Sequence, residues 1–188
     1  EHLAATAGVM VDADNAPAVR ATWRTLTGET RPWSDVAYES RRLILETALA
    51  AELNVLARRL DLISEQHRYT RDFTFASLRE ALREVLSCFP VYRTYVTRAA
   101  GYVAARDPAA ILRAVQAAER RNAVVNRSLF RFIADLLLLR DPAGLSAEQV
   151  AERREFVLRV QQLTGPVAAK GIEDTGFYRY FPLPSLAE

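Results

Sequence analysis

Residues 45–63 read LETALAAELNVLARRLDLI, and this stretch decides the fold. Its large apolar side chains recur at spacings of three and four residues: Leu45, Leu49, Leu53, Leu56, Leu60 and Ile63. That spacing places them in one stripe along a helix, while Arg58 and Arg59 fall mostly on the other face. The pattern predicts one long amphipathic helix through residues 45–63, packed on an apolar core.

Stripes of the same kind lie on the C-terminal side of this stretch, around residues 78–89, 111–115, 129–137 and 150–160. Helix-start signals precede several of them. Asp72 or Thr74 is expected to cap the first, Asn126 opens the third, and residues 146–149 form a capping-box pattern before the last. Strand alternation is absent. The sequence therefore predicts an all-α fold, an irregular helical bundle.

Composition limits the classes of function. Half of the 188 residues are hydrophobic, and 25 basic residues against 23 acidic ones give a formal net charge of +2. The hydrophobic content predicts a globular protein. The nearly balanced charge gives no indication of a basic patch that would bind nucleic acid. No apolar run is long enough for a membrane span, and the first residues lack the charged start and apolar core that are expected of a signal peptide. A single cysteine, Cys88, excludes an internal disulfide and favours a cytoplasmic location. Cys88 with His2 and His67 cannot form an ordinary zinc site, and we predict no metal and no cofactor.

Residues 88–95, CFPVYRTY, interrupt the helical pattern. Pro90 ends the preceding helix and is expected to display Tyr92, Arg93 and Tyr95 together. Aromatic faces beside a guanidinium suit sugar rings, because C–H surfaces stack on the rings and hydroxyls find donors. The same residue types are enriched at domain interfaces, so the residues alone leave both interpretations open.

The stretch QQLTGPVAAKGIEDTGFYRY, residues 161–180, also departs from core-building sequence. Its glycines, proline, carboxylates and aromatic residues are typical of a loop that builds a site. Gly171 would let the backbone approach a ligand, and Lys170 would keep a nearby Asp174 ionised. Alternatively, Asp174 or Thr175 caps a short helix. A site so close to the end of the sequence led us to expect a piece of a larger enzyme.

Four segments together resemble the maltooligosyl trehalose synthases: residues 51–56, 70–74, 88–95 and 162–180. The resemblance runs in the same order from about Gly8 to the end. This family belongs to the α-amylase superfamily and has a (β/α)8 catalytic barrel that carries large helical insertions. The resemblance implies that residues 1–163 form a helical insertion domain. Residues 164–188 would be a loop segment that returns to the catalytic barrel, which this chain lacks.

Members of the family are isomerases of trehalose biosynthesis. They rearrange the reducing-end α-1,4 linkage of a maltooligosaccharide to α,α-1,1, an intramolecular transglucosylation. By resemblance, Asp174 corresponds to the aspartate that steadies the distorted sugar, and Glu173 stands where many relatives have histidine. The nucleophile and the acid/base have no counterparts in this chain. The side chains expected to contact substrate are Tyr92, Arg93, Tyr95, Lys170 and Glu173.

Two hypotheses follow from these patterns. In the first, the chain belongs to a glucan-rearranging enzyme, its partners are a maltooligosaccharide and the barrel of the same polypeptide, and the isolated chain is inactive. Retention through a glycosyl-enzyme needs two carboxyl groups about 5 Å apart, and those groups are expected outside this chain. In the second, the chain is a non-catalytic helical interaction module whose tyrosine and arginine clusters dock a partner domain.

Overall fold

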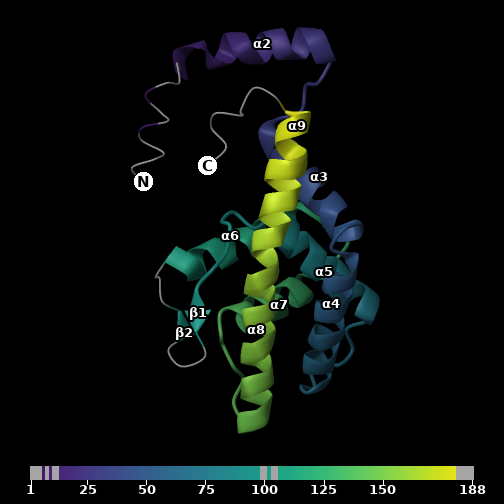
Figure 1. Cartoon of the computed structure of the whole chain (residues 1–188). Coiled ribbons are helices and arrows are strands. Elements are labelled where there is room, and N and C mark those ends of the chain that lie inside the picture. Colours follow the sequence, from purple (N-terminus) through teal and green to yellow (C-terminus); the bar gives the residue numbers. More distant parts are fainter. Residues whose placement is uncertain (1–5, 7–8, 10–12, 98–100, 103–105, 181–188) are drawn as a thin grey trace.

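The computed structural model describes residues 6, 9, 13–97, 101–102 and 106–180 and is mostly helical (Figure 1), which confirms the all-α class. Among the described residues, no helix combines the length and apolar composition that crossing a bilayer requires. In chain order the elements are η1 (Ala13–Asn15), α2 (Ala16–Thr27), α3 (Trp33–Glu46), α4 (Ala50–Glu65), α5 (Phe75–Ser87), β1 (Val96–Thr97), β2 (Gly101–Tyr102), α6 (Arg106–Arg121), α7 (Arg127–Leu137), α8 (Ala147–Ala168), η2 (Ala169–Gly176) and α9 (Phe177–Arg179).

The helix-start signals of the sequence hold in the structure. The Thr74 side chain accepts a hydrogen bond from the Ser77 backbone at the start of α5, and Asn126 does the same for Ser128 at the start of α7. A reciprocal capping box between Ser146 and Gln149 opens α8. These side chains satisfy backbone donors that the first helical turn leaves without a partner.

The prediction of one helix through residues 45–63 is wrong. A turn at Thr47–Leu49 separates α3 from α4. There the Thr47 hydroxyl donates to the carbonyl of Leu43 over 2.7 Å, which competes with helix continuation. Leu45 and Leu49 are both buried even so, because the chain bends without moving its apolar stripe away from the core. Spacing alone therefore could not reveal the break.

The long helix α8 runs through the molecule, with α3 and α4 on one side and the short hairpin on the other (Figure 1). Helices α5, α6 and α7 lie behind it, and α2 crosses the upper end. The core between them contains aliphatic and aromatic side chains that are at most 1 % exposed, among them Leu53, Leu60, Leu82, Phe130, Ile133 and Phe156. Helix α8 thus links the core to the upper end of the molecule.

The segment after α5 is fixed from two sides. The buried Gln161 amide of α8 accepts from the backbone N–H of Val96 over 2.7 Å and donates to its carbonyl over 3.2 Å. The Asp107 carboxylate accepts from the backbone N–H of Tyr95 over 2.7 Å. Strands β1 and β2 pair antiparallel, with Val96 opposite Tyr102. Side chains thereby hold residues 92–97 at a defined place beside α8.

Candidate functional site

The C-terminal segment is helical rather than a loop. Helix α8 continues without a break into the π-helical element η2 and then α9, drawn as one column that changes from green to yellow in Figure 1. The prediction of a loop from residue 164 is therefore wrong as far as residue 179, and residues 181–188 lie outside the described residues. Pro166 sits inside α8 and removes one backbone donor. Packing of the following turns against α3 offsets that loss.

The π-helical geometry of η2 is explained by two glycines that face α3. A Cβ atom on Gly171 would lie 2.8 Å from the Cα atom of Arg41, and one on Gly176 would lie 3.1 Å from the ring of Trp33. In an α-helix, residues five positions apart differ by about 140° around the axis. The wider π turn, in which Phe177 donates to the carbonyl of Ile172, brings both glycines toward one face. Gly171 thus approaches another helix, not a ligand as the sequence suggested.

An aromatic cluster anchors the end of this helix. The ring of Trp33 stacks on Phe177, with centroids 5.3 Å apart and an angle of 10° between the planes. Tyr180, which is buried, packs 5.6 Å from Trp33 and 6.4 Å from Trp23 of α2. Offset and tilted aromatic pairs of this kind stabilise packing beyond their buried area. The cluster joins α2, α3 and α9.

The two segments that the sequence singled out meet at Tyr92 and Glu173. Partial desolvation, a hydrogen-bonding interaction with Glu173 and the negative charges of Glu173 and Asp174 raise the pKa of the Tyr92 phenol. The Tyr92 ring also lies within van der Waals reach of Gly165, since a Cβ atom there would be 3.8 Å from its Cε1. We call Tyr92, Lys170, Glu173 and Asp174 the η2 site.

Arg93 and Tyr95 form a second, separate contact. The Arg93 guanidinium lies 5.0 Å from the centroid of the Tyr95 ring, a cation–π arrangement. Tyr92 instead contacts the η2 element. The expected display of all three side chains together is therefore realised in part: they share one segment, but their contacts lead to different neighbours.

Lys170 and Asp174 are exposed, as is Glu173. Among the described residues, Lys170 forms no ion pair with either carboxylate, so the predicted role of its charge is not visible as a contact. Neither Asp174 nor Thr175 caps a helix: both lie within η2, α9 has Gly176 at its N-cap, and the Thr175 hydroxyl donates to the carbonyl of Lys170. The capping interpretation of Asp174 is wrong, and its carboxylate faces solvent.

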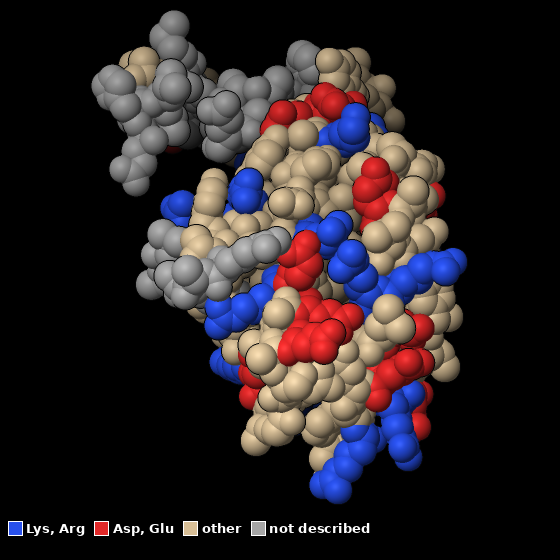
Figure 2. All heavy atoms as spheres, turned by 60° about the horizontal axis from the view of Figure 1, so that its bottom comes forward, with Lys and Arg blue, Asp and Glu red and all other residues tan. Residues whose placement is uncertain are grey.

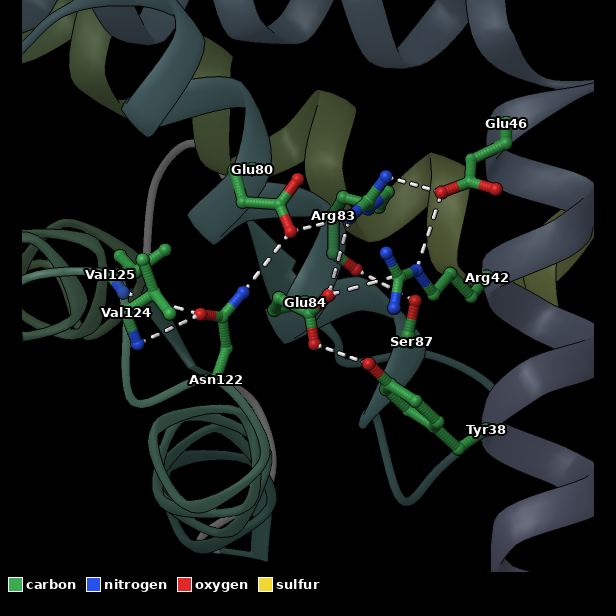
Figure 3. A network of polar contacts seen from close by, with 10 residues as sticks. All are labelled: Tyr38, Arg42, Glu46, Glu80, Arg83, Glu84, Ser87, Asn122, Val124 and Val125. Carbon is green, nitrogen blue, oxygen red and sulfur yellow. Dashed lines mark hydrogen bonds and ion pairs between the residues drawn. The ribbon is translucent and has the colours of Figure 1, made fainter.

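Sequence reasoning missed a network of buried charges between α3 and α5 (Figure 3). The Glu84 side chain is 1 % exposed. Its carboxylate accepts a hydrogen bond from the Tyr38 hydroxyl over 2.6 Å and lies 3.5 Å from Arg83 and 4.0 Å from Arg42. Burial first, then the hydrogen bond to Glu84, raises the pKa of Tyr38 to about 12. No sequence pattern indicates that these charged residues are buried, because Arg83 and Glu84 simply adjoin apolar residues in α5.

The rim of this network is partly exposed. Arg83 also pairs with Glu46 and with Glu80, whose carboxylates are less buried. Asn122 donates to Glu80 over 3.1 Å and, through its amide oxygen, accepts from the backbone of Val124 and Val125 after α6. The network therefore links three helices. A buried charge is tolerated only when it is paired in this way.

The network supports the η2 site indirectly. Arg41, next to Arg42 on α3, donates to the carbonyl of Ser87 over 3.3 Å, and its backbone is the surface against which Gly171 packs. Fixing α3 against α5 thus fixes the wall on which η2 rests. This chain of contacts positions Glu173 and Asp174 without touching them.

The remaining candidates have structural roles. The amide oxygen of Asn54, in the resembling segment 51–56, accepts from Arg79 over 2.6 Å. Burial raises the pKa of the Cys88 thiol to about 11, so it stays protonated at neutral pH and does not act as a nucleophile.

An open groove of about 480 Å³ lies between α4 and α8, lined in part by Glu52, Val55 and Pro166.

Comparison of the chain with protein-family models, with curated proteins and with solved structures finds no match. No relative therefore supplies a role for any residue. The function has to be argued from the η2 site and from the segments of sequence that meet there.

Proposed function

We propose that this chain is the helical part of a maltooligosyl trehalose synthase and that it contributes Asp174 to the catalytic site. The observation that carries the proposal is the meeting of residues 88–95 with residues 162–180, where the Tyr92 ring packs on Gly165 and its phenol lies near the charges of Glu173 and Asp174. These are the two most distinctive segments of the resemblance, and they lie far apart in sequence. Two segments of one site are expected to be neighbours in space.

The chemistry of Asp174 is compatible with the role. Its carboxylate is exposed and is not used as a helix cap, so its oxygens remain free to accept hydrogen bonds from sugar hydroxyls. A carboxylate that binds a distorted, partly cationic ring more strongly than the ground state lowers the barrier. The nucleophile and the acid/base would come from the barrel of the same polypeptide. In this proposal the exposed face of Tyr92 helps to hold the released glucose and exclude water while it turns over.

The test uses the full open reading frame that encodes this chain, expressed with maltopentaose as substrate. Asp174→Asn should lower turnover about a hundredfold or more, with a much smaller change in substrate affinity. Asp72→Asn is the matched control, because that carboxylate is also exposed and lies in a different part of the molecule. Near-normal turnover by Asp174→Asn would remove the catalytic role. Absence of any trehalose-type product from the unmodified polypeptide would remove the family assignment itself.

A second candidate function is a docking module, and a specific observation favours it. Large aromatic side chains remain exposed at the η2 site or directly after it: Tyr92 at 51 % and Tyr178 at 86 %. Tyrosine is enriched at protein interfaces. Under this alternative, Tyr178→Ala would weaken association with the partner domain, while Asp174→Asn would leave every measured activity unchanged.

A further inference from the structure

We propose that a cavity at the other end of α8 is a binding site for a neutral saccharide, separate from the η2 site. The cavity has a volume of about 540 Å³, within the usual range for small-ligand sites. It lies between the loop after α4, helix α7 and the first turns of α8, at the lower end of the molecule in Figure 1. Arg153 of its wall and Glu173 are twenty residues apart on one helical column, which is on the order of 30 Å.

Three aromatic rings form the apolar part of the cavity. Phe73 packs on Phe132, with centroids 5.9 Å apart, and both contribute to the wall. Tyr69 is 70 % exposed at the rim, where His67 and the guanidinium of Arg68 contact its ring and fix its orientation. An exposed, held aromatic ring beside an apolar floor suits the C–H face of a sugar.

The polar part of the cavity contains both hydrogen-bond donors and acceptors. Arg153, only 5 % exposed, donates from its Nε to Asp141 over 2.6 Å. In the described part of the chain no acceptor engages its terminal nitrogens, and a guanidinium carries five N–H donors. Arg140 pairs with Asp135 over 3.4 Å. Each carboxylate is thus neutralised in place and still has lone pairs to offer.

This pairing favours a neutral ligand with many hydroxyls over an anion. A sugar hydroxyl both donates and accepts, so it can use the guanidinium groups and the carboxylates at once. An anion would gain from Arg131, which forms no ion pair among the described residues, but it would have to compete with Asp135 and Asp141 for the other two arginines. On the face shown in Figure 2, acidic and basic side chains lie interspersed, without a continuous field of one sign. The choice of an α-1,4-linked glucan among saccharides rests on the proposed function.

The experiment is a titration of the 188-residue chain with maltotriose, followed by amide chemical shifts. Shifts are expected for residues 67–73 and 128–142. Tyr69→Ala should weaken the binding about tenfold, because a stacking surface is lost. Tyr92→Ala, at the far end of the column, should leave these shifts unchanged. Asp135→Asn is a second variant of the cavity lining. It should also weaken binding, because the carboxylate is expected to accept hydrogen bonds from sugar hydroxyls.

Each outcome decides the inference separately from the proposed function. Maltotriose shifts confined to residues around Tyr92 and Asp174, or no shifts at all, would overturn it. Shifts of the cavity residues by inorganic phosphate and not by maltotriose would make it an anion site and would likewise overturn it. Binding in the cavity that Tyr69→Ala weakens supports it, even where the full polypeptide makes no trehalose-type product.

Discussion

Two regions on either side of α3 use charge in opposite ways. Between α3 and α5, the carboxylate of Glu84 is buried and is surrounded by Arg42, Arg83 and the Tyr38 hydroxyl. On η2, Glu173 and Asp174 are exposed, and the Tyr92 phenol lies near their charges. The first arrangement holds helices together. The second leaves carboxylate oxygens available, which is what a ligand requires. Burial and pairing thus separate structural charges from candidate functional ones.

The largest expected effect is on the buried network. Glu84→Gln should lower the free energy of unfolding by about 3 kcal/mol, because buried Arg83 loses one of its carboxylate partners and the Tyr38 hydroxyl loses a charged acceptor. Urea denaturation of the purified chain measures this. Glu155→Gln is the matched control, since Glu155 pairs with Arg159 at the surface and should cost about 1 kcal/mol or less. Equal effects of the two substitutions would erase the distinction between the regions.

A smaller effect is expected where η2 meets α3. Gly171→Ala should lower the free energy of unfolding by about 1–3 kcal/mol, because the new Cβ atom would lie 2.8 Å from the backbone Cα atom of Arg41. Gly165→Ala provides the comparison, with ordinary van der Waals contact to Tyr92 and better helix propensity. Gly165→Ala should be neutral or slightly stabilising. A stable Gly171→Ala variant would show that η2 does not rest closely on α3.

The helix caps and the Gly171 contact show what the sequence could and could not predict. Thr74, Asn126 and Ser146 were predictable caps, because capping is a local interaction between neighbours in sequence. The close approach at Gly171 depends on Arg41, which lies 130 residues earlier, so the glycine and proline content of residues 164–176 favoured a loop. The meeting of Tyr92 with Glu173 is likewise a tertiary contact. Motif resemblance selected both residues, but only packing could place them together.

The pH dependence of the free energy of unfolding tests the buried network without removing the charge of Glu84. The pKa of Tyr38 is raised in the folded chain from about 10 to about 12, so the folded state keeps a proton that the unfolded state loses. Its contribution is therefore fully present below about pH 10 and is lost as the pH rises toward about 12. Urea midpoints across this window should fall less steeply in Tyr38→Phe than in the unmodified chain. The comparison of slopes also removes the parallel contribution of Cys88, which both proteins share.

The smallest expected effect belongs to the exposed carboxylate. Asp174→Asn should leave the urea midpoint of the chain unchanged, because the group is solvated, caps no helix and forms no ion pair among the described residues. Combined with the loss of turnover expected in the full polypeptide, this would assign Asp174 to chemistry alone. A clear destabilisation would instead give Asp174 a structural role. The carboxylates of η2 would then resemble the buried network in holding the fold together.

The π-helical turns of η2 also determine how the residues after them are rotated about the helix axis relative to α8. Loss of one residue between positions 169 and 176 would change both the winding of this segment and the rotation of the residues after it, because each residue of an α-helix turns by about 100° around the axis. Phe177 would then leave the face of Trp33, and Tyr180 would leave its place between Trp33 and Trp23. An insertion would turn them the opposite way. The length of this segment, more than its composition, decides which side chains the column presents to α3 and which it leaves in water.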